Sequence, residues 1–496
     1  MNPAGVSADA APRRRAAWAR VLPWLAVAVA ASSIRLYRLG HFSYWLDEVL
    51  DTYLVRSSWD ELWRSLRWQA LQAPLDYVLR KLVEVTGPGE VVRRLPGVAW
   101  GVACVAAFGI LLARRGGRAV GLAGAAALAL APYHVRYSQE VRPYSLGLFL
   151  LCASLLALDR YLERPTAGRL AVLYLACLAT IYSLYLAALV LLAAAASLVV
   201  ADAFDPDRAR RASARHFLRW SPAFLGALAV GLVPWWPVLI RAIHLPPDSA
   251  APAAFGPSRV VRWLAYFGFR GQDAVRPGVA EILFALLALG GAVAAWRRPR
   301  LRFVLVWTAG GLAAIEWLER RHSEFDSIFH WLPAGLGLTA LAGAGAAALL
   351  RSRVPRPLGV AALAAVLATD ARGLREYFRA GRPDWRPVAR FLAARPADER
   401  IFTENPYTLY CVGFYLCGPD WPPCKGPGRR TVLDVHGDPP TLEQARARDR
   451  DAWLLLAGGP RSEALRLWSR DLPSMSFPSA EGDAILRRLP AGGGTR

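Results

Sequence analysis

Long apolar runs recur through the first three quarters of the sequence, and they constrain the fold more than any other feature. We expect about 11 helical spans, at residues 18–38, 93–113, 118–135, 143–161, 170–182, 184–202, 219–240, 277–296, 301–318, 328–350 and 357–373. A span needs roughly 20 apolar residues, because a backbone in hydrocarbon must satisfy its polar groups within its own helix. Hydrophobic residues make up 55% of the chain, more than is usual in soluble proteins. The pattern predicts a membrane all-α protein.

Clusters of arginine separate alternate runs and predict the orientation of the chain. Basic loops stay in the cytoplasm, which would place there the segments Arg13–Arg15, Arg114–Arg118, Arg208–Arg219, Arg297–Arg302 and Arg351–Arg356. The loops at 40–92, 136–142, 241–276 and 319–327, and everything after about residue 374, would then lie outside. Because these clusters explain the net charge of +22, we expect membrane lipid as a partner and no nucleic acid.

The last 120 or so residues have a different pattern, typical of a small extracytoplasmic α/β domain. We expect an amphipathic helix at Asp384–Ala394 and a second helix at Thr441–Asp449. Strands are expected at Glu399–Thr403, Thr431–Val435 and Ala452–Ala457. The chain would therefore divide into a membrane domain, 1–374, and an outer domain, 375–496.

Three cysteines of the outer domain offer a disulfide. Cys417 and Cys424 flank a stretch rich in proline and glycine that can fold back on itself, and an outer compartment permits oxidation. Cys411, in a strand-like apolar run, is a rival partner for either. We favour Cys417–Cys424 over this rival and over three reduced, buried cysteines.

An acidic segment, Tyr44-Trp45-Leu46-Asp47-Glu48, follows the first span. Asp47 and Asp51 are four residues apart and would share a helix face, whereas Glu48 is turned away by about 100°. Carboxylates beside hydrocarbon are costly unless they are paired or functional. The alternative is a solvated helix start, where the helix dipole favours acids.

A polar segment, Tyr133–Tyr144, lies between the third and fourth runs. Pro143 suits the first turn of a helix, which would place Arg142 beside free backbone N–H groups. Such a helix start is a phosphate site. The alternative is a tight turn in which Arg142 is paired with Glu140.

Taken together, these motifs give the chain a family resemblance. In order, it has the acidic pair, a Pro-Leu-x-Tyr helix start at 74–77, Arg-Leu-Pro-Gly at 94–97, and Tyr-Ser-Gln-Glu-x-Arg-x-Tyr at 137–144. This order resembles GT-C-type membrane glycosyltransferases, in the branch of protein O-mannosyltransferases, aminoarabinose transferases and lipid A core galacturonosyltransferases. The resemblance is best over residues 35–200, and it returns at Asp-Trp-Arg-Pro-Val-Ala, 384–389.

The resemblance implies a hexosyl- or pentosyltransferase in the inner membrane. A sugar would pass from polyprenyl phosphate to an acceptor of the cell envelope, with inversion, on the outer face. Asp47 would be the catalytic base, and Arg142, with or without a divalent metal ion, would bind the leaving phosphate. Further substrate-binding residues would be Glu48, Asp51, Tyr137, Glu140 and Tyr144.

The chain departs from the family near residue 330. Members often carry an Arg-Tyr pair there, whereas this chain has Ser327–Pro333 without arginine. Arg320, Arg321 or His330 would take that role. Two other functions are a transporter or flippase of a lipid-linked sugar and a non-catalytic relative that binds one. A transporter should contain repeated halves, and we find no repeat.

The orientation leads to a first prediction. Because the arginine-rich loops belong in the cytoplasm, a reporter fused after Arg496 should be active only if it works in the periplasm. Activity of a reporter that needs the cytoplasm, fused at the same position, would overturn the orientation.

Overall fold

The computed structural model describes residues 10–69, 72–87, 89–244, 279–319, 328–351, 356–379, 384–396, 399–403, 406–418, 432–434, 452–457, 470–477 and 484–489. The chain divides into two compact units. The first unit contains residues 1–37, 63–83 and 92–374, and the second contains 38–62, 84–91 and 375–496. Two short segments that we grouped with the membrane domain, including the acidic one, thus belong with the C-terminal residues.

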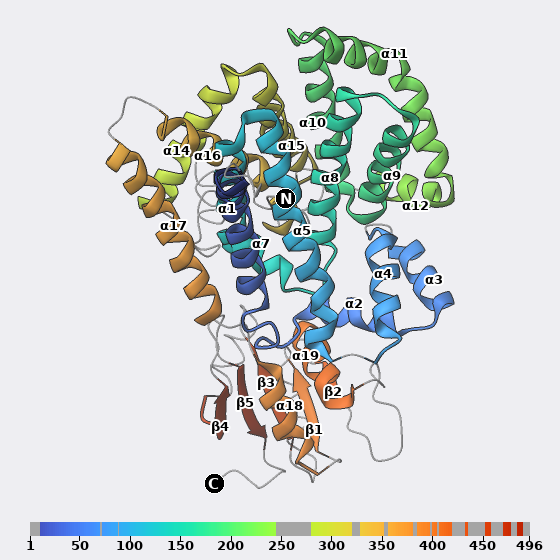
Figure 1. Cartoon of the computed structure of the whole chain (residues 1–496). Coiled ribbons are helices and arrows are strands. Elements are labelled where there is room, and N and C mark those ends of the chain that lie inside the picture. The colour runs from blue at the N-terminus through green and yellow to red at the C-terminus, as the bar shows by residue number, and fades with distance from the viewer. Residues whose placement is uncertain are drawn as a thin grey trace, which may run out of the picture. The chain divides into compact units, whose positions relative to one another are not determined.

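The first unit is helical (Figure 1), and each expected apolar run contains a helix. Its long helices are α1 (Ala10–Leu36), α5 (Glu90–Gly116), α6 (Arg118–Leu130), α8 (Tyr144–Glu163), α9 (Ala167–Ser183), α10 (Tyr185–Ala203), α11 (Arg208–Gly231), α14 (Val279–Trp296), α15 (Arg302–Glu319), α16 (Leu332–Leu349) and α17 (Arg356–Arg379). Shorter ones are α3 (Trp59–Gln69), α4 (Pro74–Glu84), α7 (Pro132–Ser138), α12 (Trp236–Ile243) and the 3-10 turns η1 (Val233–Trp235), η2 (Pro299–Leu301) and η4 (Ile328–Trp331).

These helices make the chain a multi-pass membrane protein, but the expected count of about 11 spans is not confirmed. Among the described residues, six helices are long and apolar enough to cross a membrane, or seven if α11 and the following helix, bent by 50°, form one span. Four more apolar helices, such as α6 and α9, are shorter. The apolar runs of the sequence therefore predicted where the helices lie. Some of these helices are shorter than the roughly 20 residues that an independent span needs.

Close packing of the first unit depends on small residues. A Cβ atom added to Gly343 of α16 would meet the Gly124 Cα of α6 at 2.7 Å. Gly291 of α14 lies against the backbone of Leu341, and Gly345 of α16 against that of Leu287. Helices in lipid associate through such small residues, because close backbone approach increases van der Waals contact.

A buried ion-pair cluster joins α5, α8, α10 and α11 at one end of the first unit. The Asp159 carboxylate accepts a hydrogen bond from Arg114 at 2.5 Å, and it is ion-paired with Arg115 at 2.6 Å and with Arg210. Asp202 accepts from Arg115 and Arg210, each at 2.6 Å. Both carboxylates are about 1% exposed. The positive-inside rule regards these arginines as charges of cytoplasmic loops. In the structure, Arg114, Arg115 and Arg210 form ion pairs that hold helices together.

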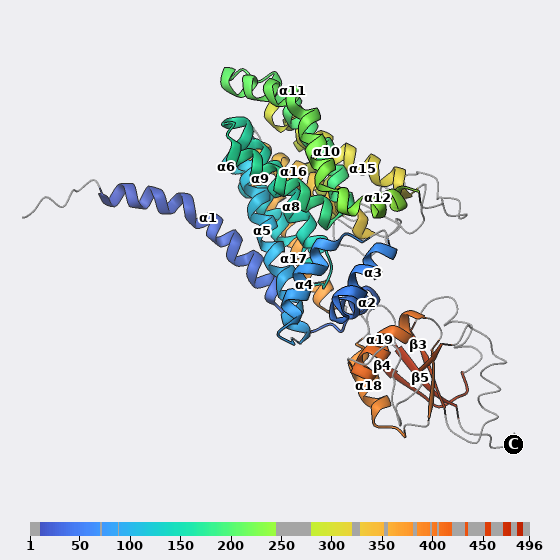
Figure 2. The same cartoon turned by 90° about the vertical axis from the view of Figure 1, so that its right-hand side faces the viewer.

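The second unit contains a five-stranded mixed sheet (Figure 2) of order β2-β1-β3-β5-β4. Its strands are β1 (Arg400–Thr403), β2 (Val432–Asp434), β3 (Ala452–Leu456), β4 (Ser474–Phe477) and β5 (Ala484–Leu489). β1 is parallel to β2 and β3, and β5 is antiparallel to β3 and β4. Three of these strands match the expected ones, and β4 and β5 add an antiparallel edge.

Two helices pack on this sheet, α18 (Trp385–Ala393) and α19 (Pro406–Cys417). Trp385 and Leu392 of α18 share a core with Ile401, Val412 and Trp453. α18 matches the expected helix. The expectation for Cys411 was wrong, since this buried residue lies in helix α19 and not in a strand-like run. The helix expected at 441–449 lies outside the described residues.

The ion-pair cluster leads to a stability prediction. Asp202→Asn should lower the free energy of unfolding by about 3 kcal/mol or more, because it leaves buried arginine charge undercompensated. Chemical unfolding in detergent micelles measures the loss. Glu163→Gln is the control: it removes a partner of Arg114 that is 47% exposed, and should cost no more than about 1 kcal/mol. Equal effects of the two substitutions would contradict a structural role for the buried cluster.

Candidate functional site

The site in the first unit depends on a break between α6 and α7. Pro132 has no N–H group, so the Leu128 carbonyl loses its helical donor at this point. Arg35 of α1 supplies donors instead: its two Nη atoms bond the carbonyl oxygens of Ala129 and Ala31 at 3.0 Å and of Leu128 at 3.3 Å. The arginine is fully buried.

The other donors of Arg35 bind the segment that follows. Nε donates to Ser138 Oγ at 3.2 Å, and Nη2 lies 2.6 Å from His134 Nδ1. Because arginine has only donors, His134 Nδ1 must accept, so the imidazole is neutral. All five N–H groups of the guanidinium are thereby bonded, and α1 is tied to both sides of the break.

Two glycines of α5 allow the same segment to approach closely. A Cβ atom added to Gly97 would meet the carbonyl oxygens of Ser138 and Glu140 at 3.0 Å, and one added to Gly101 would overlap the Ser138 side chain. Gln139 Nε2 donates to the carbonyls of Arg35 and Tyr37, both at 2.9 Å. Backbone and side chains together hold residues 138–140 against α1 and α5.

Arg142 lies directly before the N-terminus of α8, beside an aromatic cluster. Its guanidinium lies 5.3 Å from the Tyr144 ring centroid, and Nη2 donates to Tyr144 Oη at 3.1 Å. Tyr144 contacts the rings of Tyr137 and Phe329, each with centroids 5.1 Å away. His330 lies beside Phe329, at 4.4 Å. The fold therefore brings Tyr137, Arg142 and Tyr144 together with Phe329, the residue before His330.

Further charged groups border this cluster. Glu140 is buried, and it accepts from Arg136 Nε at 3.5 Å. From α4, Arg80 donates to the Val141 carbonyl at 2.8 Å and is ion-paired with Asp76. The helix start expected at Pro74 is present, and its Asp76 also positions an arginine beside the cluster.

The arrangement suits a phosphate group. Arg142 is half-buried at the start of α8, where backbone N–H groups have no intrahelical acceptor. A cation beside such donors stabilises negative charge. The expected loop at 133–144 begins as helix α7, so the segment is more rigid than a loop.

The acidic segment forms the start of α2 (Leu46–Arg56), in the second unit. Glu48 and Asp51 are both fully buried, whereas Asp47, in the first turn of α2, is only partly buried. We expected Asp47 and Asp51 to share a face. Asp47 is thus the least buried of the three acids, while Glu48 and Asp51 belong to the interior.

The chain that leads into α2 is held by α18 and α19. The Tyr44 N–H donates to Tyr415 Oη at 2.7 Å, and the Trp385 N–H donates to Ser43 Oγ at 3.2 Å. Arg386 donates to the carbonyls of Gly40 and His41. Burial raises the pKa of Tyr415, so this phenol stays neutral. The Asp-Trp-Arg motif at 384–386 thereby orients the segment that carries Asp47.

Two expected substrate-binding arginines and the question of a metal site remain. Arg320 and Arg321 lie outside the described residues. Within the described ranges, no group of three or more His, Cys, Asp or Glu residues is arranged to hold a metal ion, and we assign no step to one.

Sequence reasoning missed Arg35, Arg80 and Gln139 as parts of the site. The signal for Arg35 was present, because an ionisable residue inside an apolar run marks a functional or structural need. Arg80 carried no such signal, since its place beside Val141 depends on a contact between residues 61 positions apart.

The fold matches solved structures of membrane glycosyltransferases. ArnT from Cupriavidus metallidurans bound to undecaprenyl phosphate superposes with a TM-score of 0.54 at 13% identity, over 95% of this chain and 99% of that one. Its apo state gives 0.55 at 14% identity, over 94% and 98%. The Archaeoglobus fulgidus oligosaccharyltransferase tethered to an acceptor peptide gives 0.50 at 8% identity, over 88% and 69%.

ArnT and the oligosaccharyltransferase are both GT-C-type enzymes. The expected resemblance is therefore confirmed at the level of the fold. Neither a family model nor a curated protein matches the chain in sequence.

The cysteines of the second unit lead to another prediction. Cys417 is disulfide-bonded and Cys411 is free; Cys424 lies outside the described residues, so its pairing stays a prediction. Peptide mapping without reductant should recover Cys417 linked to Cys424, closing a short loop worth about 2–3 kcal/mol at best. Free alkylation of both residues in protein prepared without reductant would refute the bridge.

Proposed function

We propose that this protein transfers a sugar from a polyprenyl-phosphate donor to an acceptor of the cell envelope, on the outer face of the inner membrane. The observation that carries the proposal is Arg142 at the start of α8. It contacts Tyr144, whose ring contacts Tyr137 and Phe329, in a fold shared with a protein solved with undecaprenyl phosphate.

Arg142 would bind the donor phosphate and stabilise the charge that develops as the phosphate leaves. Phosphate is a good leaving group, so positive charge and free N–H groups at a helix start suffice without a general acid. The guanidinium is held by Tyr144, and its loop is held by Arg35 and Gln139. Such preorganisation lowers the cost of reorientation during transfer.

Asp47 would act as the base that takes the proton of the acceptor hydroxyl. Its partial exposure suits this role, and the buried Glu48 and Asp51 would support the start of α2. As the hydroxyl oxygen attacks the anomeric carbon, the bond to the phosphate oxygen breaks on the opposite face. A single displacement inverts that centre.

The rival functions predict different features. A flippase should be built from repeated halves, and the sequence contains no repeat that we find. Here the cluster around Arg142 gathers at a helix start. A non-catalytic relative would need only Arg142, and it should tolerate loss of Asp47.

The role of Asp47 can be tested directly. Asp47→Asn keeps the shape of the side chain and removes the base, so turnover should fall by about 10²- to 10⁴-fold. The assay follows transfer by purified protein, after mass spectrometry of envelope glycolipids and glycoproteins with and without the gene has identified the product. Asp60→Asn, in the exposed first turn of α3, is the matched control and should keep wild-type turnover. Near wild-type transfer by Asp47→Asn would exclude it as the base.

The proposed role of Arg142 predicts a loss of donor affinity rather than of turnover. Arg142→Ala should weaken binding of undecaprenyl phosphate by about 10-fold or more, because a charge-assisted hydrogen bond is lost. Arg142→Lys should recover only part of the affinity, since lysine lacks the planar fork. Arg241→Ala, at an exposed arginine of α12, should bind as wild type does. Equal affinity of wild type and Arg142→Ala would remove the phosphate assignment.

A further inference from the structure

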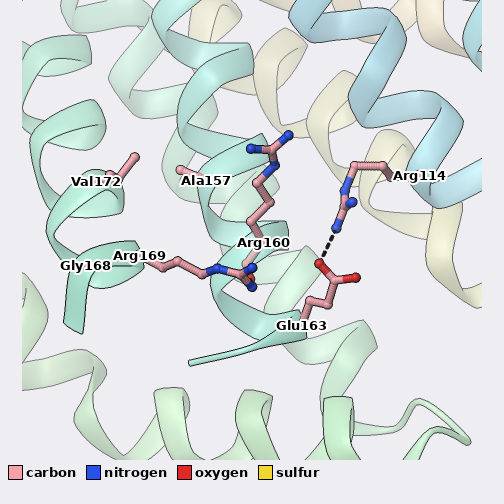
Figure 3. A pocket seen from close by; sticks show the side chains of 7 residues that line it. All are labelled: Arg114, Ala157, Arg160, Glu163, Gly168, Arg169 and Val172. Carbon is pink, nitrogen blue, oxygen red and sulfur yellow. Dashed lines mark hydrogen bonds and ion pairs between the residues drawn. The ribbon is translucent and has the colours of Figure 1, made fainter. Parts of the chain in front are cut away.

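A second basic pocket lies at the end of the first unit that contains the ion-pair cluster. Its cavity of about 350 Å³ opens between the C-terminal ends of α5 and α8 and the start of α9 (Figure 3). The lining includes three arginines and one acid, with a small apolar wall: Arg114, Arg160, Arg169, Glu163, Ala157 and Val172.

The pocket carries positive charge that carboxylates do not neutralise. Arg114 is paired with Asp159 and Glu163. Arg169 donates only to carbonyls, those of Arg160 and Arg164, at 2.6 and 3.3 Å. The exposed Arg160 side chain makes no hydrogen bond or ion pair with any residue that the structure describes. Three arginines of the lining therefore share one lining acid, Glu163, which is paired with Arg114 and interacts electrostatically with Arg169. Arg160 faces the cavity without an acidic partner among the described residues.

The start of α9 adds neutral donors to the same cavity. Gly168 lies in the first turn of this 17-residue helix, where N–H groups lack intrahelical acceptors. A Cβ atom added to Gly168 would meet nothing within 4 Å, so the cavity is open beside this residue, whereas the N–H of Arg169 is already bonded to Thr166 Oγ1. Arginines together with a helix start favour an oxyanion.

The apolar wall of the pocket favours a lipid over a soluble anion as the ligand. Val172, on the pocket wall, is 59% exposed, and Leu175 follows one turn later at 61%. An apolar stripe thus leads from the charged pocket along α9. A lipid would place its phosphate among the arginines and its acyl chains along this stripe, whereas a soluble phosphate would leave the stripe uncovered.

We propose that the Arg160–Arg169 pocket binds the phosphate of an anionic membrane phospholipid, in the leaflet on the side of the ion-pair cluster. The site is separate from the Arg142 cluster and does not depend on the proposed transfer reaction. By the orientation that the arginine loops predict, that leaflet is the cytoplasmic one.

Native mass spectrometry of the full chain in detergent, titrated with phosphatidylglycerol, tests the proposal. Arg160→Gln should weaken binding severalfold, and the double variant Arg160→Gln/Arg169→Gln about 10- to 30-fold. Arg160→Gln removes no hydrogen bond of the fold, so this variant tests the site even if the double variant is unstable. Arg208→Gln is the matched control, because Arg208 is exposed at the start of α11, near the same cluster, and does not line the cavity.

Three results would overturn the proposal. Phosphatidylglycerol affinity unchanged in Arg160→Gln would show that the pocket is not the site. An equal loss in Arg208→Gln would mean that diffuse basic charge attracts the lipid. Displacement of the lipid by inorganic phosphate at equal concentration would identify a soluble anion as the ligand. Tighter binding of phosphatidylglycerol than of phosphatidylcholine, lost only in the pocket variants, is the expected result.

Discussion

The hydrogen bonds of Arg35 are the interaction on which the site of the first unit depends. A helix that breaks within a membrane domain exposes carbonyl groups that water cannot satisfy, and Pro132 creates such a break after α6. Arg35 satisfies these carbonyls and, with the same guanidinium, bonds Ser138 and His134. The break can therefore exist without orphaned polar groups, and the chain can turn there to place Arg142 before α8.

Arginine serves opposite purposes in different parts of the first unit. In the cluster of Asp159 and Asp202, arginines are neutralised by buried carboxylates and join four helices. The same chemistry extends to Asp205, whose pKa is lowered by the hydrogen bond from Arg300. At α8, the Arg142 guanidinium lies over the Tyr144 ring, a cation–π contact that orients it. Pairing with buried acids stabilises the fold, whereas the aromatic contact orients the guanidinium that we propose to bind phosphate.

The second unit explains why the C-terminal sheet and the first loop belong together. Hydrogen bonds from Trp385 and Arg386, and the contact of Tyr44 with Tyr415, hold the segment that leads into α2. Asp47 lies only three residues after Tyr44. A domain at the far end of the sequence therefore orients the proposed base, which accounts for the return of the resemblance at 384–389.

The amino-acid sequence alone determined where the helices of the apolar runs lie. Apolar runs, prolines and helix-start residues act within a few turns of chain, so α5, α8 and α18 could be located without tertiary information, and so could Arg142 at a helix start. Only the tertiary structure decided which charges are used and how. The pairing of Arg115 with Asp202, the contact of Arg80 with Val141 and the burial of Glu48 beside Asp51 arise from folding. Two of these contacts join residues far apart in the chain, and the burial of the acids depends on what packs over α2; local periodicity reports none of them. α19 was misread for the same reason, since a short apolar run suits a helix or a strand equally well until its neighbours are known.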